Sequence, residues 1–347
     1  MAASMSMLLS CHNFRHLAVQ FNHVAKFSRF SKLLTNAPSQ TGYTSDPGEF
    51  FFNENIQQLL GRITGRDYDK IFRSRKLGQK LEPPRYELLT EDEINALRAE
   101  YEKKADLKLK MPPLLQEREP INNILAVNPE IQGFDTSKYI FTDITFGIPD
   151  RKRKVVVRDP NGVLKEASWE EKQKMCQIFF PIPGRKIKAP KMFEQEHLQG
   201  VLARKDYEFV LDRACAQYEP DDPEYIRVSR KTYDHVNDSQ AYGTLRSTRH
   251  FGPMVLHLVL SKQMDNLLSY LITIKDIAGS ADLIRVFHIV EQETSPADSM
   301  TDLELIENYI NKHALKKPTL ELALETYKEI EKQQREIDSL STSQLSN

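Results

Sequence analysis

The first 45 residues contain no aspartate or glutamate, although the chain of 347 residues carries 49 acids. This stretch holds four Lys or Arg residues and seven serines, and its apolar residues recur at spacings of three and four. A basic, amphipathic, serine-rich leader without acids is typical of a mitochondrial transit peptide. A secretory signal would need a longer apolar run than Met5–Leu9, and a flexible basic tail is the simpler alternative. We predict that residues 1–45 are a transit peptide and linker, and that the protein works in the mitochondrial matrix.

Cysteine and long apolar runs are also scarce. Of three cysteines, only Cys176 and Cys215 lie outside the leader, and they are too few for a disulfide framework. Each is expected to serve as a small apolar residue on a helix. The longest apolar run, Met254–Leu260, is interrupted by His257 and is far too short to cross a membrane. The sequence therefore predicts a protein of a reducing compartment without a membrane span.

Motifs that carry catalysis are absent from the sequence. It contains no GxxxxGK[ST], GxGxxG, GxSxG, HExxH or CxxC pattern. His250 and His257 could share one helical face two turns apart, so zinc ligation remains an alternative. Asp221, Asp222 and Glu224 lack the ligand spacing of a calcium loop and are predicted to form a solvated turn. We expect no enzymatic activity, no cofactor, no metal and no small-molecule substrate.

The sequence after the leader begins with an N-terminal helical extension, predicted for residues 46–115. An apolar stripe that starts at Phe51 indicates a short helix, which we expect Gly61 and Gly65 to end. Residues 116–270 are predicted to form the central core.

Two capping boxes predict where longer helices begin. One consists of Thr90 and Glu93, and the other of Ser168 and Glu171. The first helix is expected to end before Pro112, and its apolar face comprises Ile94, Leu97, Tyr101 and Ala105. The second is expected to run from Trp169 to just before Pro181.

Between these helices the pattern changes to strand. Aromatic and β-branched residues dominate 139–144 and 155–157. Asn161 and Gly162 lie between the segments 154–158 and 163–167. An Asn-Gly pair commonly supplies the two positive φ angles of a tight hairpin turn. We therefore predict a hairpin followed by a helix at the centre of the chain.

The remaining sequence is predominantly helical in pattern. Helices are predicted over 193–204, 207–218, 251–274 and 302–313, with a last one starting at Pro318. Residues 271–347 are predicted to form a C-terminal helical region with a frayed tail at 338–347. The predicted fold is therefore α+β, predominantly helical with a small central β-hairpin or sheet region.

Positive charge is clustered around the predicted hairpin. Residues 145–191 hold twelve Lys or Arg against five acids, a local net charge of +7. Such loops can neutralise phosphates, although an ordinary solvated surface is the simpler alternative. The candidate RNA-contact residues are Arg151, Lys152, Arg153, Lys154, Arg158, Arg185, Lys186 and Lys188.

Nine short blocks in residues 110–255 resemble the mitochondrial small ribosomal subunit protein twenty-two family. Four of the blocks are KMPP, KYIFTDI, YEPDDPEYIRV and LRSTRHFGPMV, beginning at Lys110, Lys138, Tyr218 and Leu245. The resemblance implies a non-catalytic, structural subunit that supports mitochondrial translation. It also implies contacts with the small-subunit ribosomal RNA and with neighbouring mitochondrial ribosomal proteins.

A transient assembly or translation factor of the same ribosomal subunit is the alternative function. The C-terminal part from Pro296 carries ten acids against six Lys or Arg, so it is a poor phosphate binder. Without residues 1–45 the chain would hold 44 basic and 49 acidic residues, since the leader removes four basic residues and no acids. Any RNA contact therefore depends on local basic loops, and other surfaces are available for proteins.

Overall fold

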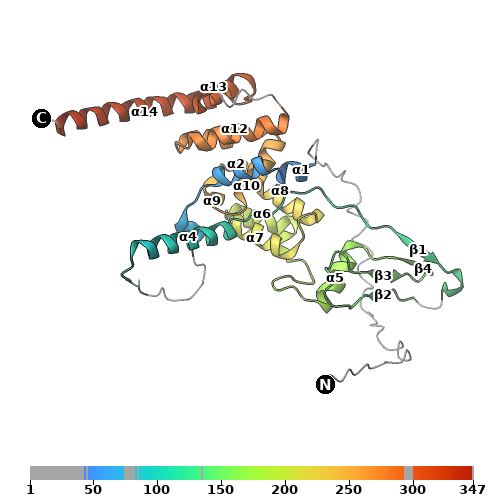
Figure 1. Ribbon diagram of the computed structural model, residues 1–347. Helices are drawn as coiled ribbons and strands as arrows, with labels where there is room; N and C mark the ends of the chain where they lie inside the picture. Colours follow the sequence, from blue (N-terminus) through green and yellow to red (C-terminus); the bar gives the residue numbers. More distant parts are fainter. Residues whose placement is uncertain are drawn as a thin grey trace. The chain divides into compact units, whose positions relative to one another are not determined.

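The structure is a computed structural model of the chain. It describes Tyr43, Pro83 and residues 46–73, 86–133, 136–292 and 300–345, the last of these with side chains to Ile337. The predicted transit peptide and linker lie outside the described residues, apart from Tyr43. The fold is predominantly helical with one small antiparallel sheet, as the sequence predicted (Figure 1). None of the described helices is long and apolar enough to span a membrane.

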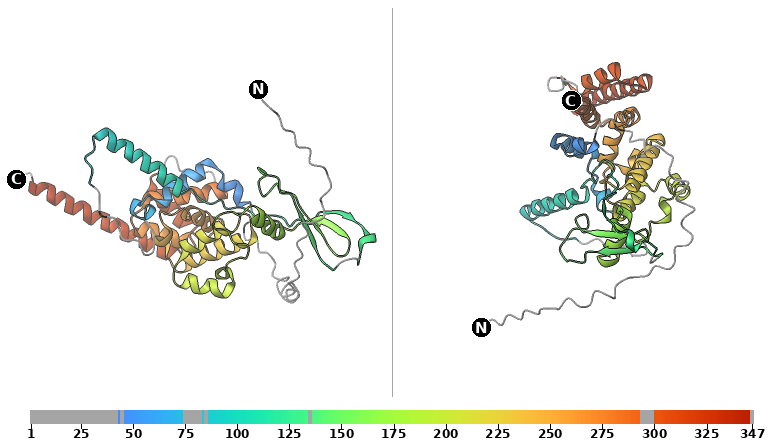
Figure 2. Two further views of the ribbon diagram at one scale, coloured as in Figure 1. Left: turned by 90° about the horizontal axis from the view of Figure 1, so that it is seen from below. Right: turned by 90° about the vertical axis from the view of Figure 1, so that its right-hand side faces the viewer.

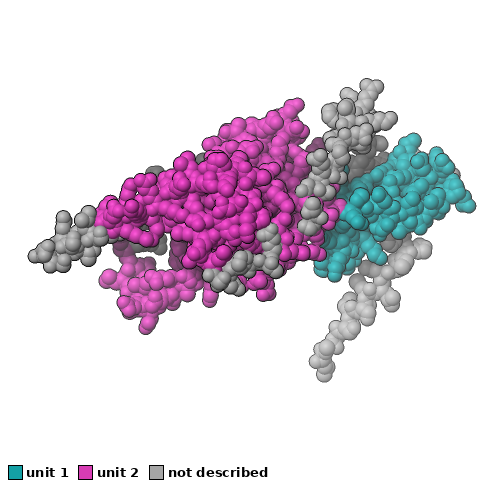
Figure 3. Space-filling view, turned by 90° about the horizontal axis from the view of Figure 1, so that it is seen from above, with its two compact units in different colours: residues 1–40, 119–187 teal, residues 41–118, 188–347 magenta. Residues whose placement is uncertain are grey.

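The chain forms two compact units, which Figure 3 distinguishes by colour. Unit 1 comprises residues 1–40 and 119–187, and unit 2 comprises 41–118 and 188–347. The elements of unit 1 are β1 (Ile124–Val127), β2 (Tyr139–Thr142), β3 (Val155–Arg158), β4 (Val163–Glu166) and α5 (Trp169–Phe179). The N-terminal part of unit 2 holds α1 (Pro47–Phe51), α2 (Glu54–Thr64), α3 (Tyr68–Ile71) and α4 (Glu91–Lys108).

The described residues of the longer C-terminal part of unit 2 are mostly helical. Its helices are α6 (Gln195–Ala203), α7 (Tyr207–Gln217), α8 (Pro223–Asp238), α9 (Tyr242–Leu245), α10 (Phe251–Leu260), α11 (Asp265–Thr273), α12 (Ile277–Glu291), α13 (Asp302–Lys312) and α14 (Lys317–Leu345). From α6 to α12, and between α13 and α14, the connections are short, which is usual for packed helices.

The sheet of unit 1 is antiparallel with strand order β1-β4-β3-β2. Successive side chains of a strand point to opposite faces, so Val155 and Val157 share the inner face of β3 and are both buried. Ala167 completes this small core, and Ile140 of β2 and Met175 of α5 pack against it. α5 therefore covers one face of the sheet.

The predicted hairpin is confirmed, but its turn differs from the prediction. Residues 159–162 form a four-residue connection between β3 and β4. Among them only Gly162 has a positive φ, of 79°, so the expected positive φ at Asn161 is wrong. A Cβ on Gly162 would lie 2.2 Å from the backbone oxygen of Asn128. Glycine is therefore needed there both for its φ angle and for the close approach of the β1 end.

The core of unit 2 is built around α10. Every residue of α10 from Phe251 to Val259 is buried, which is expected of a helix that is apolar on all sides. α2 and α12 pack closely against one another, and both also contact α10. Segments far apart in the sequence therefore form one core.

The predicted helix over 251–274 is wrong as a single element. α10 ends at Leu260, Lys262 has a φ of 56°, and α11 begins at Asp265. The N–H groups of Lys262 and Gln263 satisfy carbonyls of the last turn of α10, at 3.0 and 2.9 Å. Lysine rarely adopts this left-handed conformation, so the sequence gives little warning of the break.

Two further predictions about helix ends also need correction. Gly61 lies inside α2, with open space where a Cβ would be, and Gly65 ends the helix with a φ of 71°. The predicted solvated turn at Asp222 is wrong because this residue is buried and caps α8. Its carboxylate accepts the N–H of Glu224 at 3.0 Å and pairs with Arg118 at 2.6 Å.

Both predicted capping boxes are confirmed, at Thr90 for α4 and Ser168 for α5. A third box, formed by Thr301 and Glu304, opens α13. Each box satisfies backbone N–H groups that the first helical turn leaves without partners.

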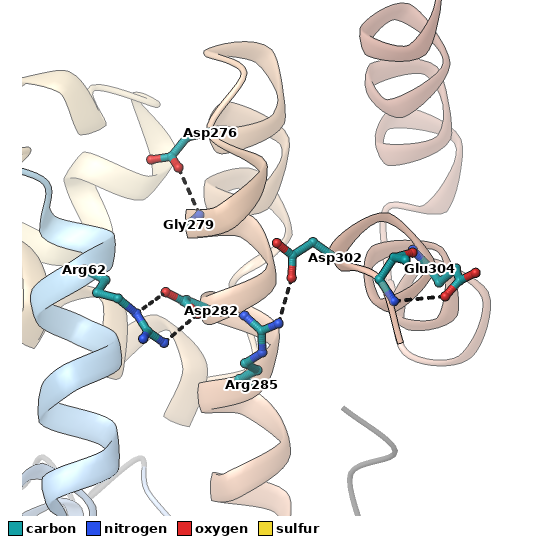
Figure 4. Close-up of polar contacts among 8 residues, drawn as sticks. Arg62, Asp276, Gly279, Asp282, Arg285, Asp302 and Glu304 are labelled. Carbon is teal, nitrogen blue, oxygen red and sulfur yellow. Dashed lines mark hydrogen bonds and ion pairs between the residues drawn. The ribbon is translucent and has the colours of Figure 1, made fainter. Parts of the chain in front are cut away.

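Charged side chains connect three helices of unit 2 (Figure 4). Arg62 of α2 contacts both carboxylate oxygens of Asp282 of α12, at 2.7 and 2.9 Å. Arg285 then bridges Asp282 to Asp302 of α13, at 2.8 and 2.7 Å. The buried carboxylate of Asp282 is thus neutralised by two guanidinium groups, which fixes α2 and α13 against α12.

Candidate nucleic-acid interface

The predicted RNA-contact residues fall on two segments of unit 1, except for Lys188. Residues 151–154 lie in the loop between β2 and β3, and Arg158 ends β3. Arg185 and Lys186 follow α5, whereas Lys188 belongs to unit 2. We call residues 143–154 the basic loop.

Arg153 is the internal anchor of the basic loop. Its side chain is only 2 % exposed and donates to the carbonyls of Asp143, Thr145 and Ile148, at 2.8 to 2.9 Å. The guanidinium also lies 3.7 Å from the centre of the Phe180 ring. The guanidinium group of Arg153 thus makes its hydrogen bonds and its ring stacking inside the protein. Arg153 therefore shapes the loop and does not present paired N–H donors to an external phosphate.

The sequence contains a signal that separates Arg153 from its neighbours. In the run from Arg151 to Lys154 the residue types alone do not show which side chain is buried. The two-residue period of an extended strand does show it, because this period places position 153 on the same side as the buried Val155 and Val157. Arg153 was therefore identifiable as the inward member of the run.

The contact between Arg153 and Phe180 links the two basic segments. Phe180 follows α5 directly, and its ring also meets that of Phe146 edge to face, with centroids 5.8 Å apart. The chain then reaches Arg185 through a turn at Gly184, which has a φ of 84°. Gln177 fixes this turn by donating to the carbonyls of Ile182 and Arg185, at 3.3 and 3.1 Å.

Around this anchor the basic loop presents charge and an aromatic ring to solvent. The side chains of Arg151, Lys152 and Lys154 are exposed, and Phe146 is 88 % exposed. The backbone carbonyl of Arg151 accepts from the ammonium group of Lys172 at 2.7 Å, which adds a second support for the loop. Exposed cations next to an exposed aromatic ring can hold a phosphate backbone and stack on an unpaired base.

The loop is also shaped by Asp143. Its carboxylate accepts the backbone N–H and the hydroxyl of Thr145, at 3.0 and 2.6 Å. These hydrogen bonds lower the pKa of Asp143, and the nearby charges of Arg153 and Lys154 act in the same direction. The carboxylate is therefore held in its charged form as part of the turn.

Other cations of the predicted cluster have acidic partners. Lys165 pairs with Asp159 at 2.7 Å, and Lys174 pairs with Glu170 at 2.7 Å. Arg158 is half-buried and donates to the carbonyl of Gly162 at 3.3 Å. The exposed cations of the predicted RNA-contact set are Arg151, Lys152 and Lys154 in the basic loop and Lys186 and Lys188 after Gly184.

The histidines considered for zinc have separate carboxylate partners in unit 2. His250 bonds to Asp212 at 2.8 Å, and His257 bonds to Asp234 at 2.8 Å. Burial lowers the pKa of His250, and the hydrogen bond to Asp212 offsets part of this shift. Within the described part of the chain, no group of three or more His, Cys, Asp or Glu side chains could hold a metal ion.

Both cysteines among the described residues lie on helices, as the sequence predicted. Cys176 is buried in α5, and the half-buried Cys215 of α7 contacts the hydroxyl of Tyr225 at 3.6 Å. Burial raises the pKa of the Cys215 thiol, so the group favours its neutral form.

These features define an α+β protein with a helical body and a small basic sheet unit suited to binding other macromolecules. Residues 49–292 match the family described as Mitochondrial 28S ribosomal protein S22, and the chain belongs to this family. It is 36 % identical over 302 residues to the small ribosomal subunit protein mS22 of Mus musculus, covering 86 % of this chain and 84 % of that protein. It is 38 % identical over 284 residues to mS22 of Bos taurus, covering 80 % of this chain and 79 % of that protein. The family resemblance inferred from the sequence is confirmed.

Proposed function

We propose that this chain is a structural subunit of the small subunit of the mitochondrial ribosome and acts there in mitochondrial translation. The observation that carries the proposal is the family match over residues 49–292. The two relatives, which are named as small ribosomal subunit proteins, align with this chain over most of their own lengths. The protein therefore works in the mitochondrion, within the mitochondrial ribosome.

The role is structural and not enzymatic. Side chains that could suggest chemistry, such as His250 and Cys215, make hydrogen bonds inside the helical body of unit 2.

The bounds 46–115, 116–270 and 271–347 remain our proposal for how the chain divides around its family core.

RNA contact is assigned to the exposed cations of the basic loop and of the segment after α5. Arg151, Lys152 and Lys154 are close in sequence on a loop that Arg153 holds in shape. An Arg fork can bind two phosphate oxygens, and a lysine contributes a point charge. Phe146 can add stacking on a base. Arg158, Arg185, Lys186 and Lys188 are the flanking candidates.

Charge reversal on the basic loop tests this assignment. The variant Lys152→Glu with Lys154→Glu should lower ultraviolet crosslinking of the full-length protein to small-subunit ribosomal RNA. Lys312→Glu with Lys332→Glu is the matched control, since both lysines are exposed and lie in the acidic C-terminal region. Equal crosslinking by the two variants would remove the basic loop from the RNA interface.

Salt-washed ribosomes separate a subunit from a transient factor. A resident subunit should remain in stoichiometric amount on mitochondrial small subunits after washing at moderate salt. Release at that salt would favour the assembly or translation factor, because contacts that depend on phosphate alone weaken steeply with ionic strength.

A further inference from the structure

The helix α4 carries an apolar face that the described residues leave largely exposed. The sequence predicts that Ile94, Leu97, Tyr101 and Ala105 share this face, yet only Ala105 is buried. Ile94, Leu97 and Tyr101 are 44 %, 38 % and 49 % exposed. We call these three residues the α4 stripe.

Among the described residues, the contacts that fasten α4 to the rest of unit 2 involve its C-terminal turns. The rings of Tyr101 and Phe72 meet edge to face with centroids 5.4 Å apart, and Arg66 pairs with Asp106 at 2.8 Å. Lys108 donates to the carbonyl of Ile71 at 3.1 Å. The N-terminal turns project away from the other helices of unit 2 (Figure 2).

Local contacts organise the projecting part of α4 as a helix. The capping box of Thr90 and Glu93 satisfies N–H groups of its first turn, and Glu100 pairs with Lys104 at 2.7 Å. Such local contacts stabilise a helix by small amounts, whereas most helical stability in proteins comes from packing of an apolar face. The spacing of the α4 stripe, at positions i, i+3 and i+7, is the pattern of a helix that inserts into a groove.

The charge around the stripe indicates which kind of partner fits. Residues 86–97 carry four acids, Glu87, Glu91, Asp92 and Glu93, and no Lys or Arg. This concentration of negative charge repels RNA phosphates and anionic lipid surfaces. The exposed apolar residues of α14, such as Leu322, also lie in an acidic region, so a second copy of this chain is a poor match.

We propose that the α4 stripe docks into an apolar groove on a basic neighbouring protein of the mitochondrial small subunit. The apolar residues supply the buried contact, and the acids of the first helical turn face Lys or Arg at the rim of the groove. That the neighbour is a ribosomal protein rests on the proposed function, whereas the stripe and its charge are properties of this chain.

Site-specific photocrosslinking tests the proposal in the intact particle. The photoreactive residue p-benzoylphenylalanine replaces Leu97 in the full-length protein, and the matched control carries it at Ala99. Ala99 is exposed on the same helix and lies near the opposite face. The Leu97 position should crosslink to one basic segment of a single ribosomal protein, and the Ala99 position should not. Crosslinks from Leu97 to RNA or to this chain itself, or a yield no higher than from Ala99, would overturn the proposal.

A second pair of variants measures the energetic contribution of the stripe. Ile94→Asp with Leu97→Asp should weaken retention on salt-washed small subunits by about tenfold, since two apolar contacts are lost. Ala96→Asp with Ala99→Asp adds the same charge on the opposite side and should be retained like the wild type. Because all four positions are exposed, thermal unfolding should be nearly unchanged in both variants. Wild-type retention of the stripe variant would refute the docking role and leave the proposed function intact, whereas failure of the wild-type chain to sediment with small subunits would refute the function itself.

Discussion

Replacing Arg153 with methionine should release the basic loop while leaving the rest of unit 1 folded. The side chain donates three hydrogen bonds from a charged group and stacks on Phe180. Hydrogen bonds of this kind contribute roughly 1.5 to 3 kcal/mol each, and the stacking adds about 1 kcal/mol. The freed carbonyls of Asp143 and Thr145 lie in a partly exposed loop and regain water, so we expect a net loss of about 3 kcal/mol.

Amide hydrogen exchange can measure this loss locally. The N–H of Asp143 donates to Lys154 and that of Lys152 donates to Pro149, at 3.0 and 2.9 Å, so both report on the loop. A loss of about 3 kcal/mol corresponds to exchange about 150 times faster at these amides. The control Lys154→Met removes the same charge from an exposed neighbour and should leave their protection nearly unchanged.

The RNA readout separates the two roles further. Lys154→Met should lower crosslinking without loosening the loop, whereas Arg153→Met should change both. If Arg153→Met left the Asp143 and Lys152 amides within about twofold of the wild type, the anchoring role assigned to Arg153 would be wrong.

Two further predictions concern single residues in each unit. Gly162→Ala should destabilise the sheet unit by about 2 kcal/mol or more, for two reasons. The new Cβ would clash with the Asn128 carbonyl, and alanine is strained at the positive φ of this position. In Gly147→Ala the new Cβ is also at a positive φ but meets no atom within 4 Å, so a denaturant titration should show a smaller loss of unfolding free energy. Equal losses in the two variants would contradict the clash at Gly162. Burial lowers the folded-state pKa of His250, so the unfolded chain takes up a proton first as pH falls through its ordinary pKa of about 6.5, and stability should decline as the pH falls below about 7. His250→Gln, which keeps a donor for Asp212, should reduce this decline in urea unfolding midpoints, and an unchanged pH dependence would exclude His250 as its source.

The sequence predicted the features whose causes are local. The boxes at Thr90 and Ser168 need only four consecutive residues, and the hairpin needs only two strand patterns around Gly162. Asp222 and Pro223 also carried a local signal, since a capping aspartate before proline at the first helical position is a common helix start. The prediction of a turn there gave too much weight to the cluster of acids.

Features fixed by distant residues could not be predicted in this way. The start of α11 is tied to the segment between α13 and α14, because the carboxylate of Asp265 accepts the N–H groups of Leu315 and Lys316 at 2.8 Å. No pattern near Asp265 reveals a partner 50 positions away in the sequence. The open face of α4 belongs to the same class, because an amphipathic pattern shows that a face is apolar but not where its cover comes from.

The interrupted course of unit 2 has a consequence for the order of folding. Its N-terminal residues 41–118 precede the sheet segment of unit 1, residues 119–187, and the rest of unit 2 begins only at residue 188. Arg62 is separated in sequence from its partner Asp282 by 220 positions, and the apolar side of α2 packs against the equally distant α12. A chain that is made or imported from its N-terminus can therefore complete the sheet unit while α2 still exposes Ile56, Leu60 and Ile63. We expect chaperones to bind residues 46–118 during this interval, and a chain that stops at residue 187 to leave them exposed to proteases.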